Sequence, residues 1–305
     1  MPEPIDLFGA GIPATDAAYR HIIESSRPEP RQARDLVYSL WRKTAAYLER
    51  GLPNRLRFEF HACFWEMYLT AILLDHKLPV VSREKRLHPS KGPDVQIGEV
   101  AAWFEAIAVT AGEGPDAVPG YSFQESVPVP DEQFKLRLTA AIQAKFRIYQ
   151  TYLSKGVVNE SEPFVIAVNA GDVPHVHQEA ALPRIISVLF PFGDEAVRFD
   201  LRTNTFGDRH FTYQGDVKKK SGTSIPTTFF EQEESRGISA VVYSTADAFN
   251  CPRIPGADLL LVHNPMATSA LPMGFLPIGR ECWRDGNSLV IHSHHPPAGA
   301  ETSQE

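Results

Sequence analysis

The sequence has little cysteine, and its cysteines form no recognisable motif. The three residues, Cys63, Cys251 and Cys282, are widely separated, and none belongs to a C-x-x-C pair. An odd number of isolated cysteines suits neither a disulfide framework nor a zinc site built on cysteine. We therefore expect free thiols in a reducing compartment, and a cytoplasmic protein.

Long apolar runs and glycine-rich phosphate loops are also missing. No stretch of about 20 apolar residues occurs, and residues 1–11 lack the basic start and apolar run of a signal peptide, so we expect neither a membrane span nor export. Neither G-x-x-x-x-G-K-[ST] nor a G-x-G-x-x-G after a strand is present, which disfavours nucleotide-driven chemistry and Rossmann redox chemistry. The G-x-S-x-G elbow of serine hydrolases is absent too.

The chain has no excess of basic residues. Its 305 residues include 30 Lys and Arg against 37 Asp and Glu, for a formal net charge of −7. This balance argues against a protein that coats nucleic acid through its overall charge, although a local basic patch stays compatible with it. Apolar residues make up 43% of the chain, enough to bury a sizeable core.

Helical and strand-like patterns alternate along the chain and predict an α/β fold. Residues 1–54 read as an N-terminal arm and a helix, residues 171–295 as a C-terminal α/β extension of the same domain, and residues 296–305 as a disordered tail. Between them, residues 55–170 follow the order helix, three strands, helix, strand. Helices are expected at residues 32–50, 58–75, 131–154, 179–189 and 227–234, and strands at residues 79–82, 93–98, 101–109, 164–169, 196–201, 210–214, 238–244, 259–263 and 288–292.

Two carboxylates on neighbouring predicted strands form the first candidate site. Asp94 opens one strand after Gly-Pro, and Glu105 lies within the apolar run of residues 103–109. A tight turn centred between Glu99 and Val100 would place the two carboxylates directly opposite each other, with Cβ atoms about 5 Å apart. Carboxylates at that distance repel each other unless a cation lies between them. The pair therefore predicts a metal site, and the structural alternative is a turn followed by a solvated glutamate.

Two residues on predicted helices could join this pair. Glu66 is flanked at helical spacing mainly by apolar residues, so it should lie on a buried face. It is either a further acidic ligand or a residue of a fully buried helix that pairs with an arginine. Lys145 interrupts an apolar stripe of its helix, so its ammonium must either reach solvent or meet a carboxylate.

The ordered set of Glu66, a Gly-Pro-Asp ending in Asp94, and Glu105 resembles the PD-(D/E)xK nuclease superfamily over residues 55–170. The resemblance implies a restriction-endonuclease-like αβββαβ core with a mixed central sheet and, here, a C-terminal α/β extension. It also implies that Asp94 and Glu105 coordinate Mg²⁺ or Mn²⁺, and that Glu66 assists as a further metal ligand.

The lysine of that motif is replaced by Ile107 in this sequence. Members of the superfamily are known in which the lysine has moved to a neighbouring helix, and Lys145 is the candidate here. The activity implied is hydrolysis of a DNA or RNA phosphodiester by metal-activated water, with Lys145 orienting or deprotonating the water or offsetting charge. A basic segment before Asp94 offers phosphate contacts or else a solvated edge, through Arg83, Lys85, Arg86 and Lys91.

Two other functions stay open at this stage. The isoleucine at position 107 and the acidic net charge suit a catalytically inactive relative that binds nucleic acid or protein. The same acidic cluster could also hydrolyse a small phosphorylated substrate. Nucleic acid is the partner that the resemblance implies, and a homodimer is compatible with the sequence.

Overall fold

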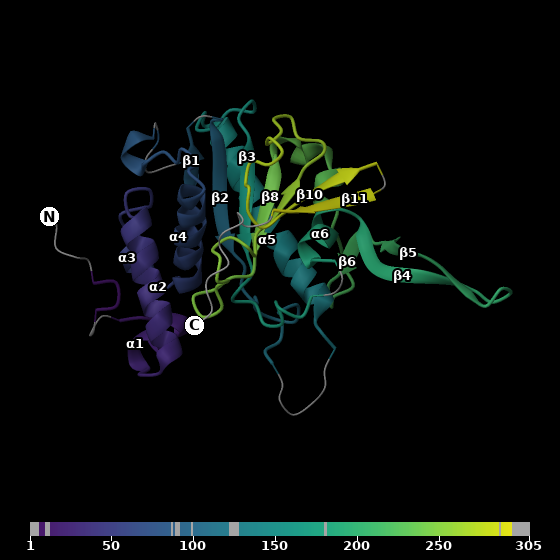
Figure 1. Ribbon diagram of the computed structural model, residues 1–305, viewed down its shortest axis with the longest axis horizontal. Coiled ribbons are helices and arrows are strands. Elements are labelled where there is room, and N and C mark those ends of the chain that lie inside the picture. The colour runs from purple at the N-terminus through teal and green to yellow at the C-terminus, as the bar shows by residue number, and fades with distance from the viewer. Residues whose placement is uncertain are drawn as a thin grey trace, which may run out of the picture.

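The structure is a computed structural model that describes residues 6–9, 13–86, 88, 92–98, 100–121, 128–179, 182–286 and 288–294. A mixed sheet of seven strands forms its centre, with helices on both faces (Figure 1). In spatial order the strands are β1 (Val95–Ile97), β2 (Ala102–Ala108), β3 (Phe164–Asn169), β8 (Ala240–Ser244), β9 (Leu260–His263), β10 (Arg280–Asp285) and β11 (Ser288–Ser293).

The sheet contains parallel and antiparallel pairs, and the pairs at both edges are antiparallel. Strands β2, β3 and β8 run parallel to one another, as do β9 and β10, whereas β1 pairs with β2, β8 with β9, and β10 with β11 in antiparallel fashion. Every residue of β3, β8 and β9 is buried, as their nearly continuous apolar sequences predict for strands covered on both faces. The prediction of a mixed α/β fold is confirmed, and strands after residue 170 extend the same sheet.

Four N-terminal helices pack on one face of the sheet. They are α1 (Ala17–Glu24), α2 (Pro28–Thr44), α3 (Leu52–Arg55) and α4 (Phe60–Asp75). Helix α4 is apolar on almost every side and lies against the sheet beneath α1 and α2, which explains why its sequence shows no polar face. The helix expected at residues 32–50 instead begins at two prolines suited to a first turn and ends at Thr44.

The opposite face is covered by α5 (Asp131–Ser154) and α6 (Arg184–Leu189). Helix α5 has the predicted bounds, with Pro130 before it and Gly156 after it in the left-handed conformation. Helix α6 is shorter than expected because the chain is extended at Pro183. The helix expected at residues 227–234 is replaced by two 3₁₀ turns, η2 (Phe229–Glu231) and η3 (Glu233–Gly237).

Three predicted strands need correction. The segment at residues 79–82 forms only one bridge, Val80 to Ile97, because the chain turns away into the 3₁₀ helix η1 (Arg83–Lys85). The strands predicted at residues 196–201 and 210–214 are longer and form a ribbon outside the main sheet. That ribbon consists of β4 (Phe192–Asp200) and β5 (Thr205–Tyr213), and a second small hairpin follows with β6 (Asp216–Lys218) and β7 (Ser224–Pro226).

Within the described residues, no helix is long and apolar enough to cross a membrane. The predicted tail, residues 296–305, lies outside the described residues.

Candidate active site

The register between β1 and β2 is the one that the sequence predicts. Val95 pairs with Phe104, and Ile97 pairs with Ala102. Continued by one residue, this register sets Asp94 opposite Glu105. This register is the one expected when four residues separate the two strands.

The carboxylate of Asp94 is fixed by the neighbouring strand. Its Oδ2 accepts a hydrogen bond from the Ala106 amide N–H at 2.8 Å. Behind it, the buried guanidinium of Arg86 donates to the carbonyl oxygens of Pro93 and Asp94 at 3.0 and 2.9 Å. Arg86 also donates to the carbonyls of Tyr47 and Val81 at 2.9 and 3.3 Å. The backbone that carries Asp94 is therefore tied to two other segments of the chain.

Lys145 reaches the acidic strands from α5. Its Nζ lies 2.7 Å from Glu105 Oε1, and both side chains are mostly buried, at 15% and 6% exposed. The Tyr152 hydroxyl, two helical turns further along α5, donates to Glu105 Oε2 at 3.4 Å. The ammonium of Lys145 therefore meets a carboxylate, the second of the two alternatives that the sequence left open.

Glu66 lies on α4, on the other side of β2, and pairs with an arginine. Arg55 Nη2 at the end of α3 lies 3.0 Å from Glu66 Oε1, and the Glu66 side chain is 10% exposed. Arg55 also contacts Glu59 at 3.1 Å and Glu49 at 3.6 Å. The arginine alternative foreseen for Glu66 is therefore realised, on a helix buried almost all round.

A cavity of about 390 Å³ brings these groups together. It opens along the outer edge of β2 and is bounded by α4 on one side and α5 on the other. Glu66, Asp94 and Lys145 all line it, together with Arg55 and the backbone strand at Ile107. Glu105 does not line the cavity itself but contacts Lys145, which does. Ile107 therefore lines the cavity at the position of the motif lysine, and the positive charge is that of Lys145 on α5.

The acidic groups perturb one another strongly. Burial, followed by the negative charge of Asp94, raises the pKa of Glu66 from its ordinary value to about 7, against the opposing effect of Arg55. Burial and Asp94 likewise raise the pKa of Glu105 to about 7, while Lys145 and Tyr152 oppose the rise. Near neutral pH both glutamates are therefore only partly ionised, and carboxylates perturbed in this way are typical of functional sites.

This donor set fits a hard divalent cation that keeps much of its water. In the described part of the chain, no three His, Cys, Asp or Glu side chains are grouped closely enough to hold a metal by themselves. Mg²⁺, however, is commonly bound by one or two carboxylates and several waters. Asp94 and Glu66 line the cavity, and positive charge there would oppose both burial and the charge of Asp94, which together raise the pKa of Glu66.

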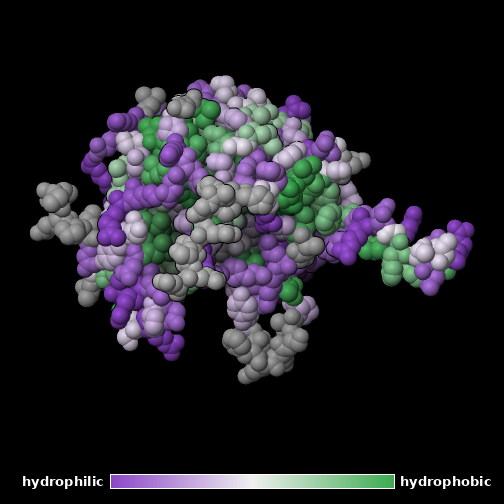
Figure 2. Space-filling model, in the orientation of Figure 1, coloured by the Kyte–Doolittle hydropathy of each residue, from purple (hydrophilic) through white to green (hydrophobic). Residues whose placement is uncertain are grey.

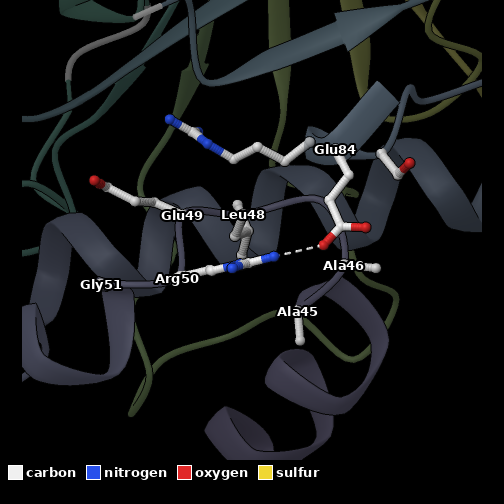
Figure 3. Close-up of a pocket in the computed structure, with 9 residues that line it drawn as sticks. Ala45, Ala46, Leu48, Glu49, Arg50, Gly51 and Glu84 are labelled. Carbon is white, nitrogen blue, oxygen red and sulfur yellow. Dashed lines mark hydrogen bonds and ion pairs between the residues drawn. The ribbon is translucent and has the colours of Figure 1, made fainter. Parts of the chain in front are cut away.

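The predicted phosphate-binding residues that the structure describes lie in different surroundings. Arg83 lines a separate groove of about 670 Å³ with Arg50, where Arg50 pairs with Glu84 at 2.7 Å (Figure 3). Lys85 is exposed on η1. Arg86 points inward to four carbonyls, so the structure gives it a supporting role for Asp94. Lys91 lies outside the described residues.

Two residues of the site were not foreseen from the sequence. Tyr152 could have been found, because it lies seven positions after Lys145 and so shares its helical face. Arg55 could not, because it belongs to a different helix from Glu66 and the angle between α3 and α4 is a matter of packing.

Comparison with known proteins adds no further constraint. No protein-family model matches the chain, no curated protein matches it, and no solved structure matches its fold. The function has to be argued from the site itself.

Proposed function

We propose that the chain is a metal-dependent nuclease with a restriction-endonuclease-like core formed by α4, β1, β2, α5 and β3. The observation that carries the proposal is the contact between Lys145 and Glu105 beside a cavity lined by Glu66 and Asp94. A mostly buried lysine that contacts Glu105 and also lines an open cavity has no evident use in the core. It suits the stabilisation of an anionic transition state.

The roles of the residues follow from their contacts. Mg²⁺ or Mn²⁺ at Asp94 and Glu66 or Glu105 would polarise a phosphate and lower the pKa of a bound water. Asp94 uses one oxygen on the Ala106 N–H, which aims the carboxylate and leaves its other oxygen without a hydrogen bond from the described residues. Lys145 favours the ionised form of Glu105 and sets a positive charge at the cavity wall, where it would offset charge on the attacked phosphate.

Substrate would reach the cavity along the outer edge of β2. Arg55 lines the cavity, and Arg83 lies close enough to Tyr152 to oppose the rise in that tyrosine's pKa. We expect Arg55 at the cavity, and Arg83 on the separate groove near it, to contact a phosphodiester backbone.

The alternative is a catalytically inactive nuclease-like fold that binds nucleic acid or protein. It is favoured by the absence, in the described residues, of a group of three metal-binding side chains. The two proposals differ in one property, which is cleavage that depends on metal.

The test is to incubate the purified chain with single-stranded DNA, double-stranded DNA and RNA, with Mg²⁺, with Mn²⁺ or with EDTA. Cleavage that needs metal, and that Asp94→Ala abolishes while Glu132→Ala retains it, is the expected result. Glu132 is a suitable control because it is an exposed carboxylate on α5. Absence of cleavage for every nucleic acid and metal would refute the nuclease, and metal binding without cleavage would support the inactive alternative.

A further inference from the structure

The β4–β5 ribbon projects from the body as an arm (Figure 1). All nine residues of β5 are exposed, and of β4 only Gly193 is buried. A two-stranded hairpin is marginally stable by itself in water. An arm of this length therefore gains from a partner that covers one of its faces.

One face of the arm carries an apolar stripe. The register pairs Val197 with Arg209 and Phe199 with Phe206, and the extra residue between these pairs lies on β5. Residues of β4 therefore keep strict alternation here, and Glu195, Val197 and Phe199 share a face with the residues opposite them. That face consists of Glu195, Val197, Phe199, Phe206, Arg209 and Phe211, which we call the arm face.

The aromatic residues of the arm face are open to solvent although they stack on one another. The Phe199 and Phe206 rings lie 4.9 Å apart, yet Phe206 remains 76% exposed and Phe199 41% exposed. The surface of the arm alternates between hydrophobic and hydrophilic patches (Figure 2). Where the arm joins the body, the centroid of the Phe192 ring lies 6.1 Å from that of Phe211 and 6.2 Å from that of the buried Phe190. The apolar stripe of the arm is therefore continuous with the core.

The charges of the arm point to a partner with the same surface. Glu195 and Arg209 lie together on the arm face, with Arg209 Nη1 3.3 Å from Glu195 Oε1. A face with one charge of each sign beside an apolar stripe is complementary to a second copy of itself. Nucleic acid fits poorly, because residues 192–213 hold four acidic residues against three arginines.

We infer that the arm face is a homodimer interface, in which two arms pack against each other about a two-fold axis. Each Glu195 then meets Arg209 of the other copy, and the phenylalanines of both copies form the dry centre. In such an isologous contact each copy contributes the same patch, so both arm faces are buried equally. Specific dimers usually bury about 1,200–2,000 Å² in total, so we expect the flanking polar residues of the arms to be covered along with the aromatics.

The first experiment is sedimentation equilibrium of the full chain at micromolar concentration. Wild type is expected to be a dimer, and Phe199→Ser with Phe206→Ser is expected to be a monomer with at least a tenfold weaker association. His210→Ser, on the opposite face of the same arm, should remain a dimer. A monomeric wild type, or a dimer that survives loss of both phenylalanines, would overturn the inference.

The second experiment separates contact between copies from folding of the arm. Glu195→Arg alone makes the arm face doubly positive, and Arg209→Glu alone makes it doubly negative, so each variant is expected to be monomeric. Mixing the two should restore a dimer that contains one chain of each kind. If the mixture stays monomeric while wild type is dimeric, the arm faces do not meet, and a dimer must use another surface. Binding of nucleic acid or lipid vesicles by a monomeric chain through this face would equally count against a second copy.

Discussion

The Ala106 amide N–H donates to Asp94 Oδ2 at 2.8 Å, so a side chain satisfies a strand donor just beyond the end of β1. Because the carboxylate is used in this way, Asp94→Asn separates its charge from its structural contact. The amide oxygen of asparagine can still accept from Ala106, while the negative charge is lost.

We therefore expect Asp94→Asn to fold normally and to lose cleavage activity by about 100-fold or more, as for a removed metal contact. Single-turnover cleavage with saturating Mg²⁺ measures the loss, and thermal unfolding checks the fold. Glu132→Gln should match wild type in both. Activity retained in Asp94→Asn would remove this carboxylate from the mechanism.

Lys145→Met should destabilise the protein because it leaves the carboxylate of Glu105 buried without its cation. Removal of one partner of a buried pair costs about 3 kcal/mol. The loss should be larger at pH 8 than at pH 6, because the uncompensated Glu105 can take up a proton at the lower pH. Urea unfolding at both pH values measures this difference.

Arg147→Met is the matched control for Lys145, since it removes an exposed cation two residues away on the same helix. It should change stability little at either pH. An effect of Lys145→Met that is independent of pH would contradict the assignment of Glu105 as its charge partner.

The raised pKa values of Glu66 and Glu105 predict how stability changes with pH. Between their ordinary values and about 7, both groups hold protons in the folded state that the unfolded chain has released. Their contribution to stability therefore falls as pH rises through this range and is constant above it. Unfolding of Glu66→Gln with Glu105→Gln at pH 5.5, 6.5 and 7.5 should show a flatter dependence than wild type.

The affinity for a divalent cation should change with pH in the opposite direction to the stability of the protein. A divalent cation binds the ionised carboxylates, so Mg²⁺ affinity should rise between pH 6 and pH 8 with release of protons. Calorimetric titration in two buffers of different ionisation enthalpy measures both quantities. Affinity that is unchanged over this range would mean that Glu66 and Glu105 take no part in binding.

Arg83 and Arg86 should differ although they lie three positions apart. Arg86→Met leaves one buried and three half-buried carbonyls without this donor and should cost about 3 kcal/mol in stability. Arg83→Ala should leave stability unchanged. It should weaken binding of any nucleic acid sequence and reduce the salt dependence of affinity by about one counterion. Equal effects of the two substitutions on affinity would contradict this division of roles.

The strand hairpin and the lysine were open to prediction because each depends on local periodicity. A short turn sets the register of Asp94 against Glu105, and the helical repeat sets Lys145 in an apolar stripe. From the sequence, contact of Lys145 with a carboxylate could be stated as one of two alternatives, the other being contact with solvent. The ion pair of Glu66 with Arg55 was one of two readings as well, but its partner depends on how two helices meet.

The parts that escaped prediction depend on tertiary context. Strand β10, which was not predicted, has the sequence Arg-Glu-Cys-Trp-Arg-Asp. Its four charged residues are unusual in a strand that pairs on both sides, with β9 and β11. The arm was predicted as two shorter strands, since Asp194 and Glu195 in β4, and Asp208 and Arg209 in β5, interrupt its apolar pattern where no core is present to select a face. The strand expected at residues 79–82 lacks a partner beyond Val80.

Arg86 joins the carbonyls of Tyr47, Val81, Pro93 and Asp94, three segments that come together only when the chain is fully folded. The N-terminal helices are thus part of the scaffold of the site, and residue 54 is a poor place to truncate the chain. A shortened protein that begins there would keep Glu66, Asp94 and Glu105 but lose the Tyr47 carbonyl, one of the four acceptors that hold Arg86 behind Asp94.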